Sequence, residues 1–286
     1  MDSKALQKLI SIWFEEDIRD GDHTSLSCIP QTQIGTQQLI IKGTGILAGV
    51  EVAKQIIHYF DPELQFEQFI SDGAAVKPGD IAFRVTGKQL SLLQVERTML
   101  NIMQRMSGIA TTTHQYQQLI EDTGCHVLDT RKTTPGLRYL EKEAVKIGGG
   151  MNHRIGLFDM ILLKDNHVDF AGGITAALTR AKQYCEAKGK NLKIEIETRN
   201  LDEIQEALTT GIPDRIMLDN FSPERTKEAV QFIRNFGSKK YIEIESSGGI
   251  TIDTLRDYAV CGVDFISVGA LTHSVKSLDM SFKAVK

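Results

Sequence analysis

Basic side chains gather at three places in this sequence, each close to the end of an apolar stretch. They are Arg131 and Lys132 in the segment LDTRKTTPGLR, then His153 and Arg154, and then Lys164. Arginine presents a planar fork of donors that matches carboxylate or phosphate oxygens, and lysine adds a compact positive charge. An isolated Arg-Lys pair is usually a solvated surface feature, but several cations that lie close together repel one another unless an anion binds them. The pattern therefore predicts a receptor for a multiply charged anion.

Lys164 and His153 each allow a second interpretation. A strand lysine can form a Schiff base with a carbonyl substrate once its amine is deprotonated, and spacing alone does not decide between this role and anion binding. A lone histidine is more often structural than catalytic. Because His153 stands next to Arg154, we interpret it as a hydrogen-bond donor to a carboxylate and not as a general base.

Two acids, Glu197 and Asp219, also stand at the ends of apolar stretches. One interpretation is structural, with the carboxylates neutralising the nearby cations. The other is a Mg²⁺ site, because Mg²⁺ usually binds one or two protein carboxylates and completes its shell with water and substrate phosphates. A sparse pair of acids beside an anion pocket fits the second pattern.

Glycines mark three loops that could approach a ligand closely. Residues 148–150 are Gly-Gly-Gly, and the segments SSGGI (246–250) and SVGAL (267–271) follow the last two apolar runs. Glycine lets backbone N–H groups cradle a phosphate, although a single Gly-Gly pair is more often a simple turn. In β/α barrels the phosphate site commonly comes from the loops after the last two strands.

The elements that position these residues are six short apolar runs in the last two thirds of the chain. They are residues 126–130, 159–167, 192–198, 215–220, 241–247 and 264–269. Helical patterns separate most of them, which predicts parallel strands with right-handed crossovers. Every run ends in a polar or tight-turn residue, and strand ends that converge on one mouth favour a β/α barrel over an open doubly wound sheet. Six strands is fewer than the usual eight.

The first third of the sequence is mixed in pattern. We expect helices over residues 3–16 and 50–60, and short strands around the glycines of QLIIKGTGILAG. The Pro-Gly-Asp turn within residues 73–88 predicts a β-hairpin. Residues 90–108 have helical periodicity, with Arg97 on the polar face, and Gly108 is expected to follow the end of this helix.

Bulk composition excludes several classes of protein. The chain has 286 residues, 41% hydrophobic and 24% charged, and a formal net charge of −4, so no global attraction to nucleic acid or to an anionic membrane is expected. Its four cysteines show no CxxC spacing, which predicts reduced thiols. Without a signal-peptide pattern or a run long enough to span a bilayer, we expect a cytoplasmic location and no membrane contact.

Several motifs carry a resemblance to a known family. LDTRKTTPGLR, GGGMNHR, LLKDNH, IEIE, MLDNF, ESSGGI and SVGALTHS stand in this order, after EDIRDGDHTS, GILAG and ERTMLNIMQRMSGIAT in the first third. Over essentially the whole chain they resemble the quinolinate phosphoribosyltransferase family. The resemblance implies transfer of phosphoribosyl from phosphoribosyl pyrophosphate to quinolinate with decarboxylation, giving nicotinate mononucleotide, pyrophosphate and CO₂ in de novo NAD biosynthesis.

The resemblance also implies an architecture. This is an α/β fold with an open six-stranded β/α barrel and a smaller N-terminal α/β sandwich domain, which accounts for the strand count. The expected domains are residues 1–112 for the sandwich and 113–272 for the barrel, with the C-terminal segment 273–286 packing back on the first domain. The family forms homodimers, in which Arg97 would complete the partner's site.

Roles for single residues follow from the same resemblance. Substrate-binding roles are implied for Arg97, Arg131, Lys132, His153, Arg154, Lys164, Glu197, Asp219, Ser247, Gly248, Gly249 and Gly269. Catalytic roles are implied for Lys132, Lys164, Glu197 and Asp219, with Glu197 and Asp219 holding Mg²⁺ directly or through water. The chemistry needs no nucleophile, because positioning and electrostatics suffice.

Three other functions remain open at this point. A paralogue encoded with molybdate transport genes shares the fold and most of the motifs. A Schiff-base lyase would use Lys164, and a non-catalytic phosphometabolite-binding protein would bind its ligand without turnover. Barrel shape alone does not choose among them.

Overall fold

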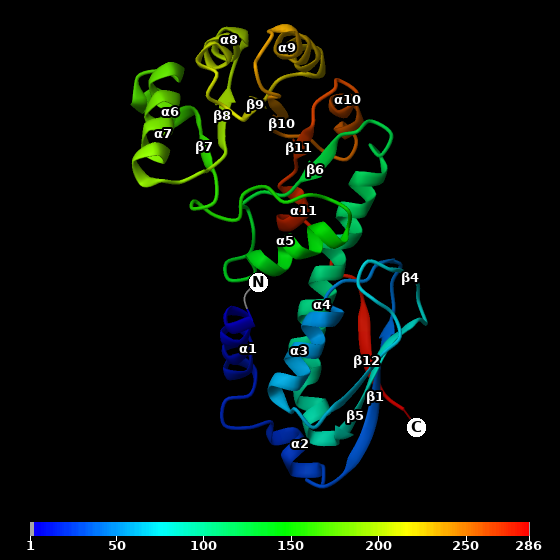
Figure 1. Cartoon of the computed structure of the whole chain (residues 1–286). Coiled ribbons are helices and arrows are strands. Elements are labelled where there is room, and N and C mark those ends of the chain that lie inside the picture. Colours follow the sequence, from blue (N-terminus) through cyan, green and yellow to red (C-terminus); the bar gives the residue numbers. More distant parts are fainter. Residues whose placement is uncertain (1–2, 286) are drawn as a thin grey trace. The chain divides into compact units, whose positions relative to one another are not determined.

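The computed structural model describes residues 3–285, which form two compact units (Figure 1). The first unit runs up to His114 and also contains residues 133–149 and the chain from Leu271 onward. The second unit consists of Gln115–Lys132 and Gly150–Ala270. The range expected for the barrel, 113–272, therefore includes a segment, 133–149, that belongs to the first unit.

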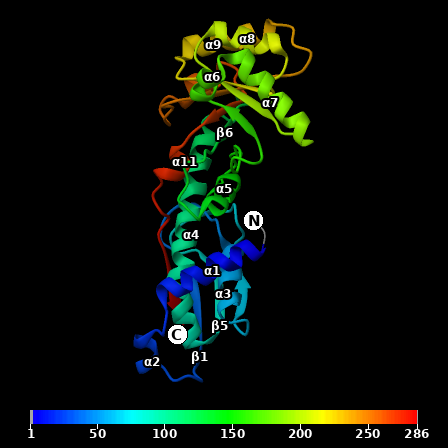
Figure 2. The same ribbon diagram turned by 90° about the vertical axis from the view of Figure 1, so that its left-hand side faces the viewer.

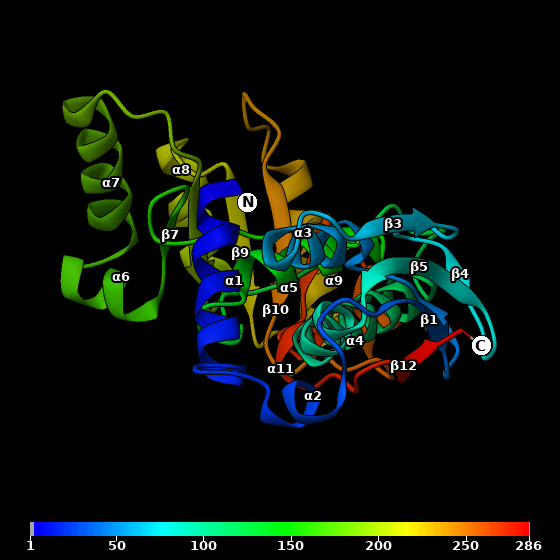
Figure 3. The ribbon, with the colours of Figure 1, turned by 90° about the horizontal axis from the view of Figure 1, so that it is seen from below.

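An antiparallel sheet forms the centre of the first unit, with strand order β12-β1-β5-β3. Its strands are β1 (Ile34–Ile41), β3 (Gln65–Gln68), β5 (Ile81–Lys88) and β12 (Met280–Ala284). Leu39 and Ile41 of β1 are completely buried, whereas the side chains between them are more exposed, as expected for a sheet with one buried face. The helices α3 (Val50–Phe60) and α4 (Gln89–Gln118) cover that face (Figures 1 and 3).

The remaining helices of this unit are short or lie at its edge. They are α1 (Ser3–Asp17), α2 (His23–Cys28) and α5 (Arg138–Ile147). Helix α1 packs against α3 (Figure 2), and the ring of Phe14 lies 4.7 Å from that of Phe60. Asp22 caps α2 by accepting a hydrogen bond from the backbone N–H of Ser25.

Two expectations for this unit are wrong. Helix α4 does not end at Gly108 but continues to Gln118, because this glycine provides space and not a stop: a Cβ there would lie 2.4 Å from the carbonyl oxygen of Lys276. The expected hairpin over residues 73–88 also does not form. Its turn is present, but β4 (Ala75–Val76) pairs with β2 (Gly45–Ile46), while β5 pairs with β1 and β3.

The second unit is built on six parallel strands in the order β6-β11-β10-β9-β8-β7. They are β6 (His126–Leu128), β7 (Ile161–Leu163), β8 (Ile194–Thr198), β9 (Arg215–Asp219), β10 (Glu243–Ser247) and β11 (Phe265–Ser267). The strands β6 and β7 are the two edges of this sheet and do not pair with each other. The expected fold class, an open six-stranded β/α barrel with a smaller α/β unit, is confirmed.

Helices cover the outer face of this sheet (Figure 1). They are α6 (Asp165–Ala171), α7 (Ile174–Lys188), α8 (Leu201–Thr210), α9 (Pro223–Asn235) and α10 (Leu255–Ala259), and α11 (Ala270–His273) follows β11. Asn200 and Ser222 cap α8 and α9, and Pro223 occupies the first turn of α9. Because side chains alternate along a strand, the buried Ile196, Ile216 and Ile244 share one face and leave the other face to polar residues.

None of the helices described over residues 3–285 has an apolar stretch of the length that a bilayer crossing requires.

Candidate active site

One pocket of the second unit collects most of the residues singled out in the sequence. Eight of them line it: Arg131, Lys132, His153, Arg154, Lys164, Glu197, Asp219 and Ser247. The lining also contains residues that the sequence analysis did not select, namely Thr130, Leu162, Met217, Glu245 and Ser267. Residues far apart in the chain meet here because the strands that carry them are parallel and end on the same side.

Four predicted residues are not part of this lining. Gly248 and Gly249 follow Ser247 after β10, and Gly269 follows β11, so all three stand within two residues of a lining residue along the chain. Arg97 is exposed on α4 in the first unit. A role for Arg97 therefore stays a prediction.

Strand register places the acids and hydroxyls of the pocket in rows. Glu197 and Glu245 both pair with Met217 of β9, which lies between their strands. Two residues further along the same two strands, Asp219 of β9 pairs with Ser247 of β10. With a period of two residues, these side chains lie on one face of the sheet, opposite the face that packs against the helices.

Two arginines at the rim of the pocket have no ion pair with an acid of the described chain, whereas Lys164 is paired with Glu197. Among the described residues, no carboxylate lies within 4.0 Å of the guanidinium group of Arg131 or Arg154. Burial and the charge of Arg131 both lower the pKa of Arg154. An arginine whose charged form is disfavoured by burial and by a second guanidinium forms a site that an anion would stabilise.

Lys164, Glu197 and Asp219 form a second charged group in the pocket. The Lys164 ammonium lies 3.4 Å from Glu197, whose side chain is only 8% exposed. Burial raises the pKa of Glu197, Lys164 opposes this shift, and the nearby Asp219 adds to it. Asp219 itself accepts a hydrogen bond from the Asn220 side chain at 2.7 Å. Lys164 is thus engaged in an ion pair with a nearly buried carboxylate of the pocket.

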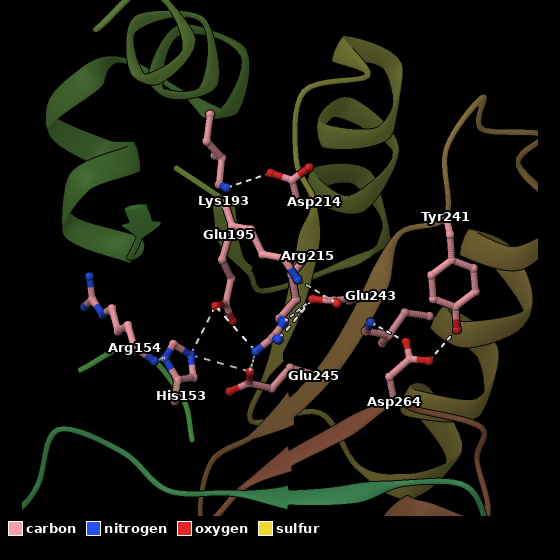
Figure 4. Close-up of polar contacts among 12 residues, drawn as sticks. His153, Arg154, Lys193, Glu195, Asp214, Arg215, Tyr241, Glu243, Glu245 and Asp264 are labelled. Carbon is pink, nitrogen blue, oxygen red and sulfur yellow. Dashed lines mark hydrogen bonds and ion pairs between the residues drawn. The ribbon is translucent and has the colours of Figure 1, made fainter. Parts of the chain in front are cut away.

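His153 lies deeper than the rim residues, with a side chain only 6% exposed (Figure 4). Its Nε2 lies 3.1 Å from Glu195 and 3.5 Å from Glu245. Its Nδ1 accepts the backbone N–H of Arg154 at 2.7 Å, and its own backbone N–H donates to Asp129 at 2.9 Å. The carboxylates that face this ring are thus carboxylates of the protein.

Arg215 is the main cation of this buried network (Figure 4). It donates to Glu243 at 3.0 Å and to Glu245 at 2.8 Å, and its guanidinium lies over the ring of Phe265 at 4.3 Å. Burial lowers the pKa of Arg215, but the carboxylates of Glu245, Glu195 and Glu243 outweigh it and the net shift is upward. A guanidinium so held is available to the acids of the interior and not to a ligand.

The donor atoms of His153, Glu195 and Glu245 lie within 4.8 Å of one another, a separation that a metal ion could bridge. Two observations disfavour a metal there. Because Nδ1 accepts a hydrogen bond, the ring proton sits on Nε2, which then has no lone pair for a metal. Arg215 already supplies a positive charge 2.8 Å from Glu245. Burial also raises the pKa of both Glu195 and Glu245, which favours a bound proton at these carboxyl groups.

The loops after β9 and β10 hold each other in place. Asn220 donates its backbone N–H to the carbonyl oxygen of Ser247 at 2.9 Å and adopts a positive φ of 55°. Gly248 has a φ of +107°, and a Cβ at this position would lie 2.2 Å from the Asn220 side chain. The glycine is therefore required by close approach to Asn220.

The segment LDTRKTTPGLR divides between the two units. Thr130, Arg131 and Lys132 belong to the second unit and line the pocket. The threonines that follow are anchored in the first unit, where Glu141 accepts the backbone N–H of Thr134 at 3.1 Å. Only the first half of this motif thus contributes side chains to the pocket.

The sequence analysis missed the buried part of the site, namely Glu195, Arg215 and Glu245. A signal was present, because IEIE and YIEIES alternate apolar and acidic residues in runs predicted to be strands of a parallel sheet. Such strands are buried on both faces, so acids at alternate positions must lie together in the interior and need a cation there.

Comparisons with known proteins agree with this geometry. Residues 22–107 match the sequence model of the quinolinate phosphoribosyl transferase N-terminal domain, and residues 109–283 match that of its C-terminal domain. A Bacillus subtilis relative named a probable nicotinate-nucleotide pyrophosphorylase (carboxylating) is 40% identical, over 98% of this chain and 94% of its own length. A chloroplastic nicotinate-nucleotide pyrophosphorylase (carboxylating) from Oryza sativa subsp. japonica is 42% identical, over 97% of this chain and 77% of its own.

Solved structures extend the similarity to the backbone. NadC from Streptococcus pyogenes has a TM-score of 0.92 at 35% identity, covering 100% of this chain and 99% of its own. The nicotinate-nucleotide pyrophosphorylase from Francisella tularensis has a TM-score of 0.92 at 38% identity, covering 100% of this chain and 98% of its own.

Proposed function

Because this chain belongs to the quinolinate phosphoribosyltransferase family, we infer that its pocket binds quinolinate and phosphoribosyl pyrophosphate together. The protein transfers phosphoribosyl to quinolinate with decarboxylation, and the products are nicotinate mononucleotide, pyrophosphate and CO₂. The observation that supports this reaction best is a pocket lined by cations, two of which have no carboxylate of the described chain within 4.0 Å.

The rim cations serve as the receptor for the two carboxylates of quinolinate. Arg131 and Arg154 offer planar forks that fit carboxylates, and Lys132 and Lys164 add point charges on the same pocket. Burial and the charge of Arg131 lower the pKa of Arg154, and a dianion bound there offsets both effects. The same charges exclude a neutral pyridine as an efficient substrate.

The acids Glu197 and Asp219 are the groups that would hold Mg²⁺. They fit this ion because both are carboxylates that line one anion pocket, where burial and, to a smaller extent, the charge of Asp219 raise the pKa of Glu197. When bound, Mg²⁺ supplies positive charge to the pyrophosphate leaving group. Lys164 lies 3.4 Å from Glu197 and opposes the upward shift of its pKa, which favours a carboxylate that can bind either the metal or the ribose hydroxyls.

The loops after the last two strands serve as the cradle for the 5-phosphate. Ser247 offers a hydroxyl, and Gly248, Gly249 and Gly269 offer backbone N–H groups without side chains in the way. The contact between Gly248 and Asn220 fixes the first of these loops beside Asp219.

The reaction then needs positioning and charge more than a nucleophile. The pyridine nitrogen forms a bond to C1 of the ribose as the bond from C1 to pyrophosphate breaks, and Lys132 stabilises the departing charge. The pyridinium that results accepts the electron pair of the bond to the 2-carboxylate, which leaves as CO₂. A proton then replaces it at C2.

We also propose a homodimer in which Arg97 completes the partner's pocket. This exposed arginine does not line the pocket of its own second unit, yet it stands on a helix of the matched N-terminal domain. Mixing Arg97→Ala with Arg131→Ala tests this proposal. Random exchange makes half of the dimers heterodimers with one intact site each, which restores about a quarter of wild-type activity. Proven subunit exchange without recovery would refute the shared site.

A cytoplasmic location is part of the same proposal. It is supported by the cysteines, all four of which are unpaired in the described structure, as in a reducing compartment. The relatives from plants include chloroplastic and mitochondrial enzymes, so fractionation of the source cells would decide the compartment.

A turnover assay tests the reaction directly. Purified protein is incubated with phosphoribosyl pyrophosphate and Mg²⁺, with quinolinate in one tube and nicotinate in the other, and nicotinate mononucleotide and CO₂ are followed. Product from quinolinate only is the expected result. Binding of both substrates without product would instead indicate the phosphometabolite-binding protein, and lack of quinolinate binding the paralogue associated with molybdate transport. Borohydride trapping of a carbonyl ligand at Lys164 would indicate the lyase.

A further inference from the structure

The ring of His153 lies between the backbone of Arg154, which donates to Nδ1, and two buried carboxylates, which lie close to Nε2. Nδ1 accepts the backbone N–H of Arg154 at 2.7 Å, which places the ring proton on Nε2. Nε2 in turn lies 3.1 Å from Glu195 and 3.5 Å from Glu245 (Figure 4). A ring with this tautomer and these neighbours points its only proton at the protein interior.

Of the two carboxylates that face Nε2, Glu245 is held by a hydrogen bond, and Glu195 lies 4.0 Å from the guanidinium of Arg215. Glu245 accepts a hydrogen bond from Arg215 at 2.8 Å, and Arg215 is fixed from other sides by Glu243 at 3.0 Å and by the ring of Phe265 at 4.3 Å. Both Glu195 and Glu245 have completely buried side chains. The network therefore places two buried carboxyl groups, one of them bonded to Arg215, on the Nε2 side of the imidazole.

The other end of the ring acts on Arg154. The Arg154 backbone N–H is bonded to Nδ1, while the Arg154 side chain lines the pocket. The preceding peptide is fixed as well, because the backbone N–H of His153 donates to the buried Asp129 at 2.9 Å. The backbone that carries the Arg154 guanidinium is thus anchored through two successive N–H groups.

We propose that His153 is a positioning residue: it connects the Arg215 network to the backbone of Arg154 and so places the Arg154 guanidinium for the dicarboxylate, without donating to the substrate itself. This inference rests on the proposed function of the pocket as a quinolinate receptor. It revises the sequence-based prediction, in which His153 donates to a substrate carboxylate.

Two substitutions separate the two nitrogens of the ring. In His153→Asn the side-chain oxygen can reach the former place of Nδ1 and accept the Arg154 N–H, but nothing replaces Nε2. In His153→Gln the amide reaches the former place of Nε2, but nothing replaces Nδ1. The proposal expects His153→Gln to raise the KM for quinolinate about tenfold, as for one misplaced charge-assisted hydrogen bond, and to change kcat and the KM for phosphoribosyl pyrophosphate much less.

His153→Asn should raise the KM for quinolinate less than His153→Gln does. If His153 bound the substrate through Nε2, the order would reverse, with His153→Gln the milder change. Equal effects of the two substitutions on the KM for quinolinate, in variants that unfold at similar temperatures, would also overturn the proposal. His126→Gln, at an exposed position on β6, is the matched control and should leave all three constants as in the wild type.

A measurement on the unmutated protein keeps the proposal separate from the proposed reaction. In ¹⁵N spectra of histidine-labelled protein without substrates, His153 should show a protonated Nε2 and an unprotonated Nδ1, and quinolinate binding should leave this tautomer unchanged. The opposite tautomer, or a change of tautomer on quinolinate binding, would refute the positioning role. Lack of turnover in the wild type would refute the proposed reaction. The ¹⁵N spectra would still show which nitrogen of His153 carries the proton, and so would still test the positioning role.

Discussion

The second unit contains two groups of charges that differ in what neutralises them. At the rim of the pocket, Arg131 and Arg154 lie near each other without a carboxylate of the described chain within 4.0 Å. In the interior, Arg215 is surrounded by Glu195, Glu243 and Glu245. Arginine thus stands in two environments in one unit: the rim arginines have no ion pair with an acid of the described chain, and the interior arginine is paired by acids of the fold. The comparison predicts that rim substitutions change activity and interior substitutions change stability.

Arg215→Met should have the largest effect on stability. Removing this guanidinium leaves buried carboxylates without their main cation, a change that typically costs about 3–5 kcal/mol. Urea unfolding of the whole chain measures it. The control is Arg256→Met, which breaks an exposed pair with Asp122 and should cost less than about 1 kcal/mol. Equal losses in the two variants would remove the distinction between interior and surface charge.

Arg131→Ala should affect activity and spare the fold. Loss of a bidentate contact to a substrate carboxylate lowers kcat/KM for quinolinate on the order of 10²- to 10³-fold. Because Arg131 is exposed, the midpoint of urea unfolding should stay close to that of the wild type. Arg131→Lys keeps the charge but not the planar fork, so its kcat/KM for quinolinate should lie between those of Arg131→Ala and the wild type. A large loss of stability in either variant would show that the rim is structural.

Glu245→Gln tests the protonation of the interior. Burial raises the pKa of Glu245 from 4.5 to about 7, so the folded state holds this proton where the unfolded chain has lost it. The contribution of this group to stability is full below pH 4.5 and is lost as the pH rises towards 7. The unfolding free energy of the variant, relative to the wild type, should therefore rise over this range by up to about 3 kcal/mol. A constant difference between pH 5 and pH 8 would contradict the raised pKa.

Lys193→Ala should have the smallest effect of the series. Lys193 lies at the solvent end of the network, 2.9 Å from Glu243, and its side chain is 58% exposed. Such pairs contribute about 0.2–1 kcal/mol, and salt screens them. Thermal unfolding at low and high ionic strength should show a slight difference from the wild type at low salt only. A loss of stability as large as that of Arg215→Met would show that Lys193 is energetically part of the buried network.

The sequence was sufficient for features that depend on local pattern. The six strands of the barrel, the helices between them and the convergence of Lys164, Glu197 and Asp219 on one pocket all follow from periodicity and from the rule that parallel strands end together. Asn200 and Ser222 mark their helix starts as the capping preferences require.

Features that depend on partners distant in sequence were not predictable in this way. Gly108 is a residue type that commonly follows a helix end. Here it lies within the helix, where the missing side chain leaves space for the backbone of Lys276. The turn at 77–80 is present, but β4 finds its partner in β2 and not in the next strand. Likewise, the side chain of His153 could be assigned to the site from sequence. The acids that lie near its Nε2, however, come from two strands distant in sequence, β8 and β10.

The pairing of β12 with β1 has a consequence for how the chain is made. Leu39 lies opposite Phe282 in a sheet whose other strands precede the whole second unit in the sequence. During synthesis, β1 therefore remains an open edge while the barrel is translated, because its last neighbour emerges only afterwards. Such an edge is a template for wrong pairing with another nascent chain. Residues 280–284 thus complete the sheet only at the end of synthesis. A chain truncated before Met280 would keep the edge of β1 exposed after release from the ribosome.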